Sequence, residues 1–441
     1  MERILAAFRR ADKPLYLVGA AARNFLRTQD WGTPGVFEFI SPISRKEIFQ
    51  LQDLPVRYKT QRGPIPVNVE LGEHTLLGYI TCSSRKKSNA QALERMLKKR
   101  GYTIEALAID GSGQVFDPFG VQKDLELQKI QLFQKEPVRA FEEDALKLIG
   151  LARLVAELGV QPERALLRSA TEEAGRVLFA PRDGWFREMT MLLCGPHVWE
   201  GMQVLFDTRV LGLLLPEAHA MVGFAETSRY HHKDLWDHTR QVIDQAIPTP
   251  LVRWAALLHD VGKCWTRTYG KRKEVHFYMH DELGAILVEG IATRFRMEPS
   301  FQDALAFLVR NHLRPNSYVP EWTDSAVRRL ITESGDRLQP LLQLSRADMT
   351  SGNEQKRQLA AQRANELARR VEAIQKKDAR RTFLPTGLGR DIIETLALEP
   401  GPRVQRIKRF LEESIEAGEL EAWKDIEYYM EFLRKQTSLP E

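Results

Sequence analysis

The pattern of hydrophobic and polar residues differs between the beginning of the chain and the rest. Short apolar or alternating runs recur in the first 125 residues and are typical of strands. The expected strands cover residues 15–19, 36–40, 66–70 and 75–82, and a hairpin that turns at Gly111 covers residues 104–117. After about residue 135, apolar residues recur at helical spacing to the end of the chain. The pattern therefore predicts an α+β protein, with a mixed sheet followed by helices.

The chain of 441 residues is longer than one ordinary domain, because domains contain about 100–200 residues each. The hydrophobic pattern changes near Pro137, Gly223 and Gly352, and the sequence contains no internal repeat. We therefore predict four parts, which cover residues 1–135, 136–222, 223–351 and 352–441.

Composition excludes several classes of protein. Hydrophobic residues make up 43% of the chain, charged residues make up 28%, and the mean hydropathy is −0.35, which excludes disordered and fibrous proteins. No apolar run approaches the length of about 18 residues that a membrane helix needs, and the charged first residues are unlike a secretory signal. Three widely spaced cysteines exclude a disulfide framework and a cysteine-rich zinc module. We expect a cytoplasmic protein that does not bind a membrane.

Positive charge is concentrated in two runs, although the whole chain carries a net charge of only +5. Residues 84–101 contain seven basic residues and one acidic residue, and residues 351–381 contain nine basic and four acidic residues. The basic residues of the first run are Arg85, Lys86, Lys87, Arg95, Lys98, Lys99 and Arg100. Clustered Lys and Arg neutralise phosphates, so both runs are candidates for RNA binding. Each run is equally compatible with a solvated helix face.

Histidines provide the first chemical signal, because seven of the ten lie between residues 231 and 312. The candidate metal ligands are His238, His259, Asp260, His280, His312 and Asp348. Most lie in helical patterns about one helix and one loop apart, so neighbouring helices can each direct one ligand to a common centre. Imidazole and carboxylate together suit divalent ions, and we expect one or two ions of manganese, iron, nickel, cobalt, zinc or magnesium.

Such a centre predicts chemistry on phosphoesters. A metal held by neutral nitrogens and a carboxylate converts bound water to hydroxide near neutral pH. Lys263, which follows Asp260 by one helical turn, and Arg346 are expected to bind a phosphate oxygen or to balance charge. Asp260, Lys263 and Arg346 are therefore the candidate catalytic residues. For His238 or His312 taken alone, an ordinary buried or surface histidine is the alternative.

The motifs around these histidines resemble a known family. They read Asp-His-Thr, Ala-Leu-Leu-His-Asp-Val-Gly-Lys, Phe-Tyr-Met-His-Asp-Glu-Leu-Gly-Ala and Leu-Val-Arg-Asn-His. The segment from His231 to Asp348 resembles the metal-dependent phosphohydrolase domain of the HD superfamily, and in particular the HD domain of many bacterial tRNA nucleotidyltransferases (CCA-adding enzymes). The resemblance implies removal of phosphates, or opening of 2′,3′-cyclic phosphates, on nucleotides and RNA ends.

The resemblance extends over nearly the whole chain, so that residues 1–135 correspond to a nucleotidyltransferase head and residues 136–222 to a helical neck that reads the nucleobase. Residues 15–24 resemble the family's entry motif, Gly-Gly-x-Val-Arg-Asp. Arg23 matches the arginine of this motif, whereas Ala20 replaces the second glycine and Asn24 replaces the aspartate. A side chain in place of glycine is expected to hinder the close approach of the triphosphate.

The following strand carries the largest departure from the family. Two aspartates on this strand hold two Mg²⁺ ions in the family, whereas Val36 and Glu38 occupy their positions here. Valine cannot bind a metal, so we expect a degenerate transferase site. An alternative is that another carboxylate, such as Asp30 or Glu70, completes it.

Two further motifs also differ. Residues 97–106 resemble Leu-x-Arg-Arg-Asp-Phe-Thr-Ile-Asn-Ala, with Gly101 in place of the aspartate and Glu105 in place of the asparagine. The base-reading motif Glu-Asp-x-x-Arg keeps Asp144, but Lys147 replaces its planar arginine. The residues expected to contact RNA or a nucleotide are Arg23, Arg85, Lys86, Lys87, Lys99, Arg100, Asp144 and Lys147.

These observations lead to one main expectation and two alternatives. We expect an HD-type phosphohydrolase that acts on the 3′ end of tRNA or another RNA, with a catalytically inactive head that binds RNA. Within residues 352–441, the segments 386–391 and 398–404 resemble the part of the family's tail that grips tRNA. The Pro-Gly-Pro run in the second segment is equally compatible with a simple boundary between two helices. The first alternative is a tRNA nucleotidyltransferase that adds C or A with an atypical metal site. The second alternative is a protein that binds RNA without catalysis.

Overall fold

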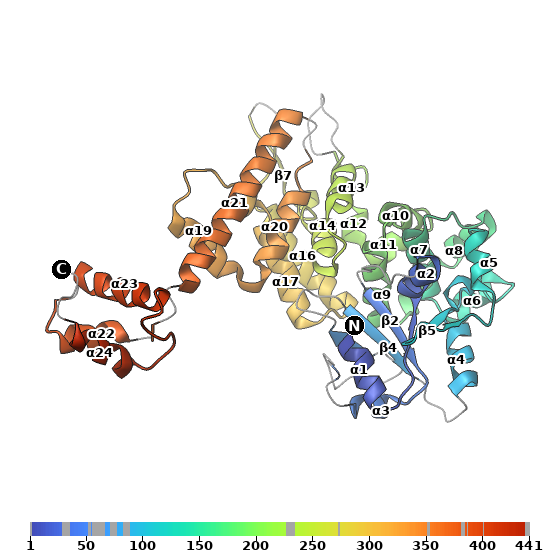
Figure 1. Cartoon of the computed structure of the whole chain (residues 1–441). Helices are drawn as coiled ribbons and strands as arrows, with labels where there is room; N and C mark the ends of the chain where they lie inside the picture. Colours follow the sequence, from blue (N-terminus) through green and yellow to red (C-terminus); the bar gives the residue numbers. More distant parts are fainter. Residues whose placement is uncertain are drawn as a thin grey trace. The chain divides into compact units, whose positions relative to one another are not determined.

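The structure is a computed structural model whose chain divides into two compact units. Unit 1 contains Met1–Ser317 and Asp336–Ala361, and unit 2 contains Tyr318–Gly335 and Gln362–Glu441. The structure describes residues 2–28, 36–51, 54, 67–70, 77–82, 89–225, 234–271, 274–350, 353–380, 384–385, 387–399 and 401–436. Among these residues, no helix combines the length and the apolar character that crossing a bilayer requires. Figure 1 shows the order of the elements along the chain.

A six-stranded mixed sheet forms the start of unit 1, with the strand order β3-β4-β2-β1-β5-β6. The strands are β1 (Tyr16–Val18), β2 (Val36–Ser41), β3 (Val67–Glu70), β4 (Leu77–Cys82), β5 (Ala108–Asp110) and β6 (Val115–Phe116). Strands β2 and β4 are parallel, and the other neighbours are antiparallel. The predicted sheet, including the hairpin at Gly111, is therefore confirmed. The residues just before this hairpin form a 3₁₀ turn, Thr103–Glu105, instead of a strand.

Hydrophobic residues cover both faces of this sheet, because side chains alternate along each strand. The first five helices are α1 (Glu2–Arg10), α2 (Gly19–Thr28), α3 (Arg45–Phe49), α4 (Asn89–Lys98) and α5 (Val121–Glu126). On one face, Leu17 and Phe39 pack with Phe8 of α1. On the other face, Val18 and Ile40 join a cluster that continues into the following helices. The register pairs Val18 with Glu38, which places Glu38 opposite the end of β1.

The neck consists of helices packed around α7. Its elements are α6 (Pro137–Glu143), α7 (Lys147–Leu158), α8 (Arg164–Glu172), α9 (Arg182–Leu193), α10 (Val198–Asp207), α11 (Val210–Leu214) and α12 (Pro216–His219). Helix α7 is buried on nearly all sides, as expected for a helix that is apolar all round. Helix α10 packs closely on it, since a Cβ atom on Gly201 would lie 2.6 Å from the carbonyl oxygen of Ala152.

The remainder of unit 1 is a helical domain with one short hairpin. Its helices are α13 (Leu235–Gln245), α14 (Pro250–Leu258), α15 (Lys263–Thr266), α16 (His280–Phe295), α17 (Pro299–Asn311), α18 (Leu313–Asn316) and α20 (Leu338–Ala347). Helix α14 is buried along its whole length and provides the centre of the core. Strands β7 (Arg267–Tyr269) and β8 (Val275–Phe277) form an antiparallel hairpin that the helical pattern did not predict. The α+β class itself is confirmed.

Unit 2 combines α19 (Asp324–Ser334), most of α21 (Glu354–Arg380), α22 (Leu388–Thr395), α23 (Pro402–Glu416) and α24 (Ile426–Lys435). Ion pairs join α21 to α19, with 2.8 Å between Arg328 and Asp378 and 3.0 Å between Arg370 and Asp324. Residues of α22, α23 and α24 form a small core of their own around Tyr429. The finer division of the chain into four parts stays a prediction.

Candidate metal centre and head pocket

Five helical segments bring ligand side chains to one point in unit 1. His238 lies in the first turn of α13, His259 follows α14, His280 begins α16, His312 lies between α17 and α18, and Asp348 follows α20. Four of these five side chains are therefore at or next to helix ends, where the backbone can turn a side chain inward. The sequence predicted one ligand in each of several packed helices. The structure shows that most of these ligands lie at the ends of the helices.

The turn after α14 explains the spacing of the His-Asp-Val-Gly-Lys motif. A Cβ atom on Gly262 would lie only 2.1 Å from the carbonyl oxygen of His280. Because glycine alone permits this contact, the turn can touch the first residue of α16. The motif thereby brings Asp260 beside His280, although the two residues are separated by a hairpin.

The ligand atoms form two groups, and within each group all of them lie within 4.8 Å of one another. The groups are His238, His259 and Asp348, and Asp260, His280 and His312. In the first group, the Nε2 atoms of His238 and His259 are 3.1 Å apart. Oδ1 of Asp348 is 3.2 Å from Nε2 of His238 and 3.5 Å from Nε2 of His259. The structure thus brings all six predicted ligands together in what we call the histidine cluster.

Asp260 lies between the two groups. Its Oδ2 atom is 3.2 Å from Nε2 of both His238 and His259. Its Oδ1 atom is 3.3 Å from Nε2 of His280 and 3.6 Å from Nε2 of His312. A carboxylate with one oxygen directed to each group is suited to bridging two metal ions.

Hydrogen bonds on the outer side of each imidazole fix its orientation. The Nδ1 atoms of His259, His280 and His312 lie 3.0, 2.7 and 2.6 Å from the carbonyl oxygens of Ala256, Phe277 and Val309. Nδ1 of His238 lies 2.8 Å from the hydroxyl of Thr350. When Nδ1 carries the proton and donates it outward, Nε2 keeps a free electron pair for a metal. The sequence interpretation named none of these outer partners, since backbone carbonyls leave no signature.

Charge and burial favour the metal-binding forms of Asp260 and His312, whereas without a metal they favour the protonated form of His259. Burial opposes ionisation of Asp260, but His259 and Lys263 outweigh it and hold the pKa of this carboxyl well below its usual range. Burial lowers the pKa of His312 to about 4, so its imidazole is neutral at pH 7. Burial also disfavours the charged form of His259, yet the adjacent carboxylates of Asp260 and Asp348 raise its pKa to about 10. An anionic carboxylate and a neutral imidazole are the forms that bind divalent metals.

The donor set fits a divalent metal. Nε2 of His280 and Nε2 of His312 are buried and have no hydrogen-bond partner among the described residues. Buried polar atoms normally have one, so two orphaned nitrogens that face a shared carboxylate require an explanation. A metal ion is the explanation that accounts for both nitrogens at once.

The two predicted cations differ in their placement. Nζ of Lys263 donates to Oδ2 of Asp260 at 2.7 Å, so this lysine lies at the cluster as expected. Arg346 is in the last turn of α20 and its side chain is exposed. Its role in charge balance stays a prediction.

A second concentration of charged side chains lies in the head. Gly19, at the turn from β1 into α2, has a φ of +69°, and a Cβ atom there would lie 2.1 Å from Oε2 of Glu38. The same oxygen accepts a hydrogen bond of 2.9 Å from Arg100, which also donates to Glu105 at 3.0 Å. Burial disfavours ionisation of Glu38, but Arg100 reverses this effect and lowers the pKa of Glu38 to about 2. Glu38 is therefore a carboxylate already neutralised by a guanidinium.

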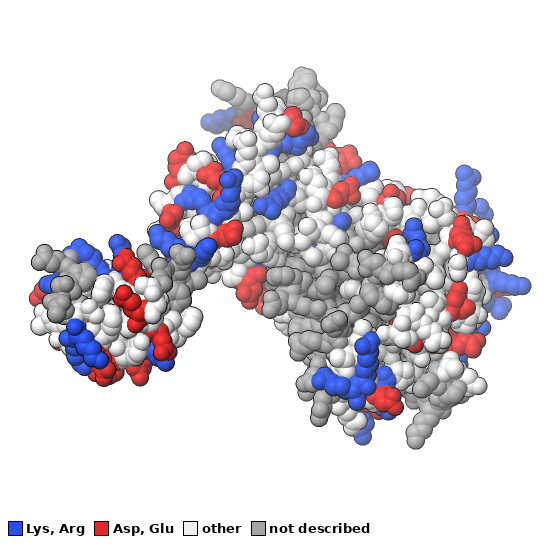
Figure 2. Space-filling view, in the orientation of Figure 1, with Lys and Arg blue, Asp and Glu red and all other residues white. Residues whose placement is uncertain are grey.

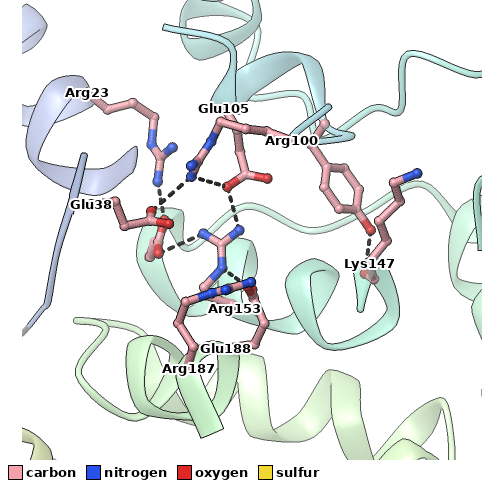
Figure 3. A network of polar contacts seen from close by, with 10 residues as sticks. Arg23, Glu38, Arg100, Glu105, Lys147, Arg153, Arg187 and Glu188 are labelled. Atoms are coloured by element: carbon pink, nitrogen blue, oxygen red, sulfur yellow. Dashed lines mark hydrogen bonds and ion pairs between the residues drawn. The ribbon is translucent and has the colours of Figure 1, made fainter. Parts of the chain in front are cut away.

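Helices α7 and α9 supply further members of this ion-pair network, which we call the head pocket (Figure 3). Arg153 pairs with Glu105, with Glu157 at 2.9 Å and with Glu188 at 2.7 Å. Arg23 pairs with Glu157, and Arg187 pairs with Glu188 at 3.2 Å. The four guanidinium groups and four carboxylates are Arg23, Arg100, Arg153, Arg187, Glu38, Glu105, Glu157 and Glu188. The network therefore balances its own charge.

The sequence interpretation missed Arg153, Glu157, Arg187 and Glu188. A usable signal was present, because Arg153 and Glu157 interrupt a helix that is otherwise apolar on every side. Buried charges of this kind need partners.

The two predicted base-reading residues both make local contacts, and Lys147 is buried whereas Asp144 is half-buried. Lys147 is buried, and its Nζ donates to the carbonyl oxygen of Ala140 at 3.1 Å. Its carbon chain occupies the space beside Gly101, where a Cβ atom would lie 2.4 Å from Cε of Lys147. Asp144 follows α6 and accepts from the backbone N–H of Leu146 at 3.1 Å.

In the part of the head that the structure describes, the carboxylates of the pocket are all ion-paired and offer no free pair for two divalent ions. Glu38 is the only carboxylate in the sequence of β2, and Arg100 occupies its oxygen. The side chains of Val36, Asp30 and Glu70, and all of Arg85, Lys86 and Lys87, lie outside the described residues. Lys99 is exposed at the end of α4. On the face seen in Figure 2, basic and acidic side chains of the described residues are interspersed, so that face carries mixed charge.

Comparisons with known proteins agree on one family. Residues 222–350 match the HD domain family. The chain is 30% identical to the A-adding tRNA nucleotidyltransferase of Deinococcus radiodurans over 343 residues, which cover 74% of this chain and 76% of that protein. It is 28% identical to the multifunctional CCA protein of Xanthomonas campestris over 346 residues, which cover 72% and 79% of the two chains. A CCA-adding enzyme of Bacillus stearothermophilus, solved in complex with CTP, aligns with a TM-score of 0.47 and 18% identity over 98% of this chain and 96% of that chain.

These relatives overturn the prediction that the protein is an HD phosphohydrolase with an inactive head. The relative from Deinococcus radiodurans is named as an A-adding tRNA nucleotidyltransferase and not as a hydrolase. The prediction inferred the reaction of the whole protein from the candidate metal ligands. Metal ligands alone do not specify a reaction. The chain belongs to the tRNA nucleotidyltransferase family, as a member that carries an HD domain.

Proposed function

We propose that the protein adds nucleotides to the 3′ end of tRNA. The observation that supports this proposal most strongly is the identity of 30% with an A-adding tRNA nucleotidyltransferase over about three quarters of both chains. The head keeps the strand-turn-helix entry, since Gly19 has a left-handed conformation directly after β1. The tRNA partner expected from the sequence is part of the same proposal.

In this proposal the outer pair of the head pocket receives the incoming nucleotide. The side chains of Glu38 and Arg100 are 12% and 13% exposed, whereas those of Arg153 and Glu105 are each 3% exposed. A triphosphate that enters from solvent therefore meets Arg100 first. It competes with Glu38 for the guanidinium, because phosphate oxygens accept the same charge-assisted hydrogen bonds as a carboxylate. Arg153 remains paired with its three carboxylates and holds the floor of the pocket in place.

The test is a nucleotide addition assay with tRNAs that lack one, two or three 3′ nucleotides and with labelled ATP or CTP. We expect incorporation by the unaltered protein, and a loss of at least about 100-fold with Arg100→Ala or Glu38→Ala, which is typical for removal of a charged group that acts on the transition state. Glu94→Ala, an exposed carboxylate on α4, is the matched control and should leave the rate unchanged. Tight tRNA binding without any incorporation would refute the proposal and would indicate a protein that binds tRNA without modifying it.

We infer further that the histidine cluster holds divalent ions. His238, His259 and Asp348 would hold one ion, and Asp260, His280 and His312 would hold or share a second. A divalent ion supplies a Lewis acid when it is bound. The ligands come from segments far apart in the chain, so the ions would also join α13, α14, α16, α17 and α20. Loss of the ions is therefore expected to lower the melting temperature.

Elemental analysis of the purified protein tests this inference. It should detect one or two equivalents of manganese, iron, nickel, cobalt, zinc or magnesium. A ligand present at about 100 times its dissociation constant stabilises a protein by about 2.7 kcal/mol, so chelation should lower the melting temperature by several degrees. His312→Ala should abolish that shift, whereas His219→Ala, which lies outside the cluster, should not. Metal content at background in a protein that adds nucleotides would refute the inference and leave the transferase proposal intact.

A further inference from the structure

The segment that joins α14 to α16 carries an unusual number of exposed aromatic side chains. Trp265, Tyr269 and Tyr278 are 52%, 67% and 67% exposed. They are three of the five aromatic side chains that are mostly exposed in the described part of the chain, and the other two, Phe179 and Trp423, are far away in sequence. Rings of this size are normally buried, so a group of exposed ones marks a binding surface.

The hairpin β7–β8 explains why these rings remain outside the core. Its register places Arg267 opposite Phe277 and Thr268 opposite His276. The ring of Phe277 lies 6.3 Å from that of Phe224, and the guanidinium of Arg267 lies 3.8 Å above the same ring. This face of the hairpin, which by alternation also carries Tyr269, is therefore packed on the rest of unit 1. The opposite face, with Thr268 and His276, points away from that contact.

The outer face presents rings in a stacked arrangement. The rings of His276 and Tyr278 have centroids 5.1 Å apart and planes 18° apart. Tyr278 is 67% exposed, so one face of this stack remains open for another flat ring. Nucleobases are flat rings that stack on aromatic side chains regardless of their sequence.

The charge of the same segment complements a nucleic-acid backbone. Residues 263–273 contain five basic residues and no acidic residue. They are Lys263, Arg267, Lys271, Arg272 and Lys273, of which Arg272 and Lys273 lie outside the described residues. Exposed aromatic rings alone can bind many kinds of partner. Exposed rings beside a concentration of positive charge are suited to a single strand of nucleic acid, which offers unstacked bases and phosphates.

The hairpin is also joined directly to the candidate metal centre. Met279 has a φ of +60°, a conformation that few residues other than glycine adopt. At this point the chain turns from the exposed side chains of Tyr278 and Met279 to the buried side chain of His280. Nδ1 of His280 lies 2.7 Å from the carbonyl oxygen of Phe277, so strand β8 helps to orient a ligand of the cluster.

We propose that Trp265, His276 and Tyr278, named here the hairpin platform, bind unpaired nucleotides at the 3′ end of an RNA by stacking. The proposal assigns a binding site to this surface and rests on the proposed function only in taking the RNA to be tRNA. The platform recognises bases that are free of pairing, because a paired base in a duplex keeps its faces covered by its neighbours. A blunt duplex of the same length therefore binds without using the rings.

The experiment measures the affinity of the full-length protein for two RNA hairpins at one fixed salt concentration. One hairpin ends in a four-nucleotide 3′ overhang and the other is blunt. We expect the double variant Trp265→Ala plus Tyr278→Ala to bind the overhang about 5- to 100-fold more weakly, as for the loss of stacking on one base or more. Affinity for the blunt hairpin should stay unchanged. Tyr278→Phe should bind like the unaltered protein, since it keeps the ring.

Trp423→Ala, at an aromatic residue of unit 2 that is 74% exposed, is the matched control and should leave the ratio of the two hairpin affinities unchanged. A terminal 2-aminopurine should lose fluorescence on binding to the unaltered protein and keep it with the double variant. Melting temperatures of all variants should agree, as these side chains are exposed.

Two outcomes would overturn the proposal: an unchanged affinity of the double variant for the overhang, or an equal loss for both hairpins. Binding of the platform to anionic vesicles or to a protein, with overhang affinity unchanged in the double variant, would likewise overturn it. Failure of nucleotide addition with normal overhang discrimination contradicts the transferase proposal and supports this one, so the two failures are distinguishable.

Discussion

The histidine cluster and the head pocket are both buried sets of polar side chains. They differ in their charge balance and in which of their atoms lack a hydrogen-bond partner. In the pocket, four guanidinium groups face four carboxylates, so the charges balance, although Nε and Nη1 of Arg23 and Nε of Arg100 are buried without a hydrogen-bond partner among the described residues. In the cluster, Nε2 of His280 and Nε2 of His312 have no partner among the described residues. The comparison teaches that the kind of unpartnered atom indicates the kind of ligand. Imidazole nitrogens with a free electron pair beside a shared carboxylate fit a cation, whereas guanidinium N–H groups fit an anion.

The two sites also differ in the contacts that a bound ligand would have to break. An ion that enters the cluster meets Nε2 of His280 and Nε2 of His312, which have no hydrogen-bond partner among the described residues. A nucleotide that enters the head pocket must instead separate Glu38 from Arg100, which are 2.9 Å apart. We therefore expect loss of an internal ion pair of the pocket to lower the free energy of unfolding. Loss of a ligand of the cluster is expected to weaken metal binding.

The largest expected effect is on the head pocket. Arg153→Met removes a buried cation and leaves Glu105, Glu157 and Glu188 without their common partner. Breaking a buried ion pair on one side costs about 3–5 kcal/mol, and urea unfolding should show a loss of this size. Arg176→Met is the matched control, because Arg176 is 41% exposed and pairs with Glu142 and Glu173 at the surface. Exposed pairs contribute about 0–1 kcal/mol.

If both variants lost the same free energy of unfolding, the pocket would not be held by its own charges, and the contrast with the cluster would fail. Arg153→Lys sharpens the test. Lysine keeps the charge but lacks the fork that reaches three carboxylates, so its loss should lie between those of the other two variants.

The second prediction concerns the cluster. Asp260→Asn keeps the shape of the side chain but removes the charge that faces both ligand groups. Replacing partners that only orient a metal ligand costs about 10- to 100-fold in affinity, so loss of the bridging carboxylate should cost at least about 100-fold. Metal titration followed by calorimetry measures the change. Asp281→Asn alters the aspartate of the second His-Asp pair, which lies in the first turn of α16 outside the cluster. A similar loss in both variants would contradict the assignment of Asp260.

The sequence was sufficient to predict the cluster because its ligands belong to short motifs. His259, Asp260 and Gly262 lie within four residues, and the close contact of Gly262 with His280 then follows from local geometry. The strands of the head sheet were also predictable, since their alternating side chains pack on both faces.

The head pocket was only half predictable. The sequence alone was sufficient to recognise the departures from the family at Val36, Glu38 and Gly101. It did not indicate the charged residues of α7 and α9 that complete the ion-pair network. Nothing near Arg153 in the sequence indicates that it lies beside Glu105, which is 48 residues earlier. Pairing across such distances depends on how helices pack, and a single sequence carries no direct record of it. The hairpin β7–β8 was missed for a different reason, because three-residue strands are too short for their alternation to stand out from helical periodicity.

The third prediction uses pH. Arg100 holds the pKa of Glu38 at about 2 despite its burial, whereas an unfolded glutamate titrates near 4.3. A lowered pKa stabilises the folded state above the unfolded value, and this contribution is lost as pH falls from about 4.5 to about 2. The free energy of unfolding of the unaltered protein should therefore exceed that of Glu38→Gln by about 2 kcal/mol at pH 6. The difference should shrink at pH 3, and urea unfolding at the two pH values measures it. A difference that is independent of pH would show that the charge of Glu38 is not what the pocket uses.

The smallest expected effect tests whether the shape of the pocket depends on the pair of Glu38 with Arg100. Gly19→Ala adds a methyl group where Oε2 of Glu38 lies 2.1 Å away, in a backbone conformation with a φ of +69°. Gly120→Ala adds the same group at a φ of +74°, with no heavy atom within 4 Å. Both variants carry the backbone strain, about 1 kcal/mol, so their difference isolates the clash. Because Glu38 is the end of a flexible side chain, it can move aside, but it must then leave Arg100. We expect Gly19→Ala to lose about 1–2 kcal/mol more than Gly120→Ala in urea unfolding, which is the contribution of a charge-assisted hydrogen bond. This excess should vanish in the Glu38→Ala background, where no carboxylate remains to be displaced. If the excess persisted there, the methyl group would be clashing with the backbone, and the position of Glu38 would not depend on the glycine.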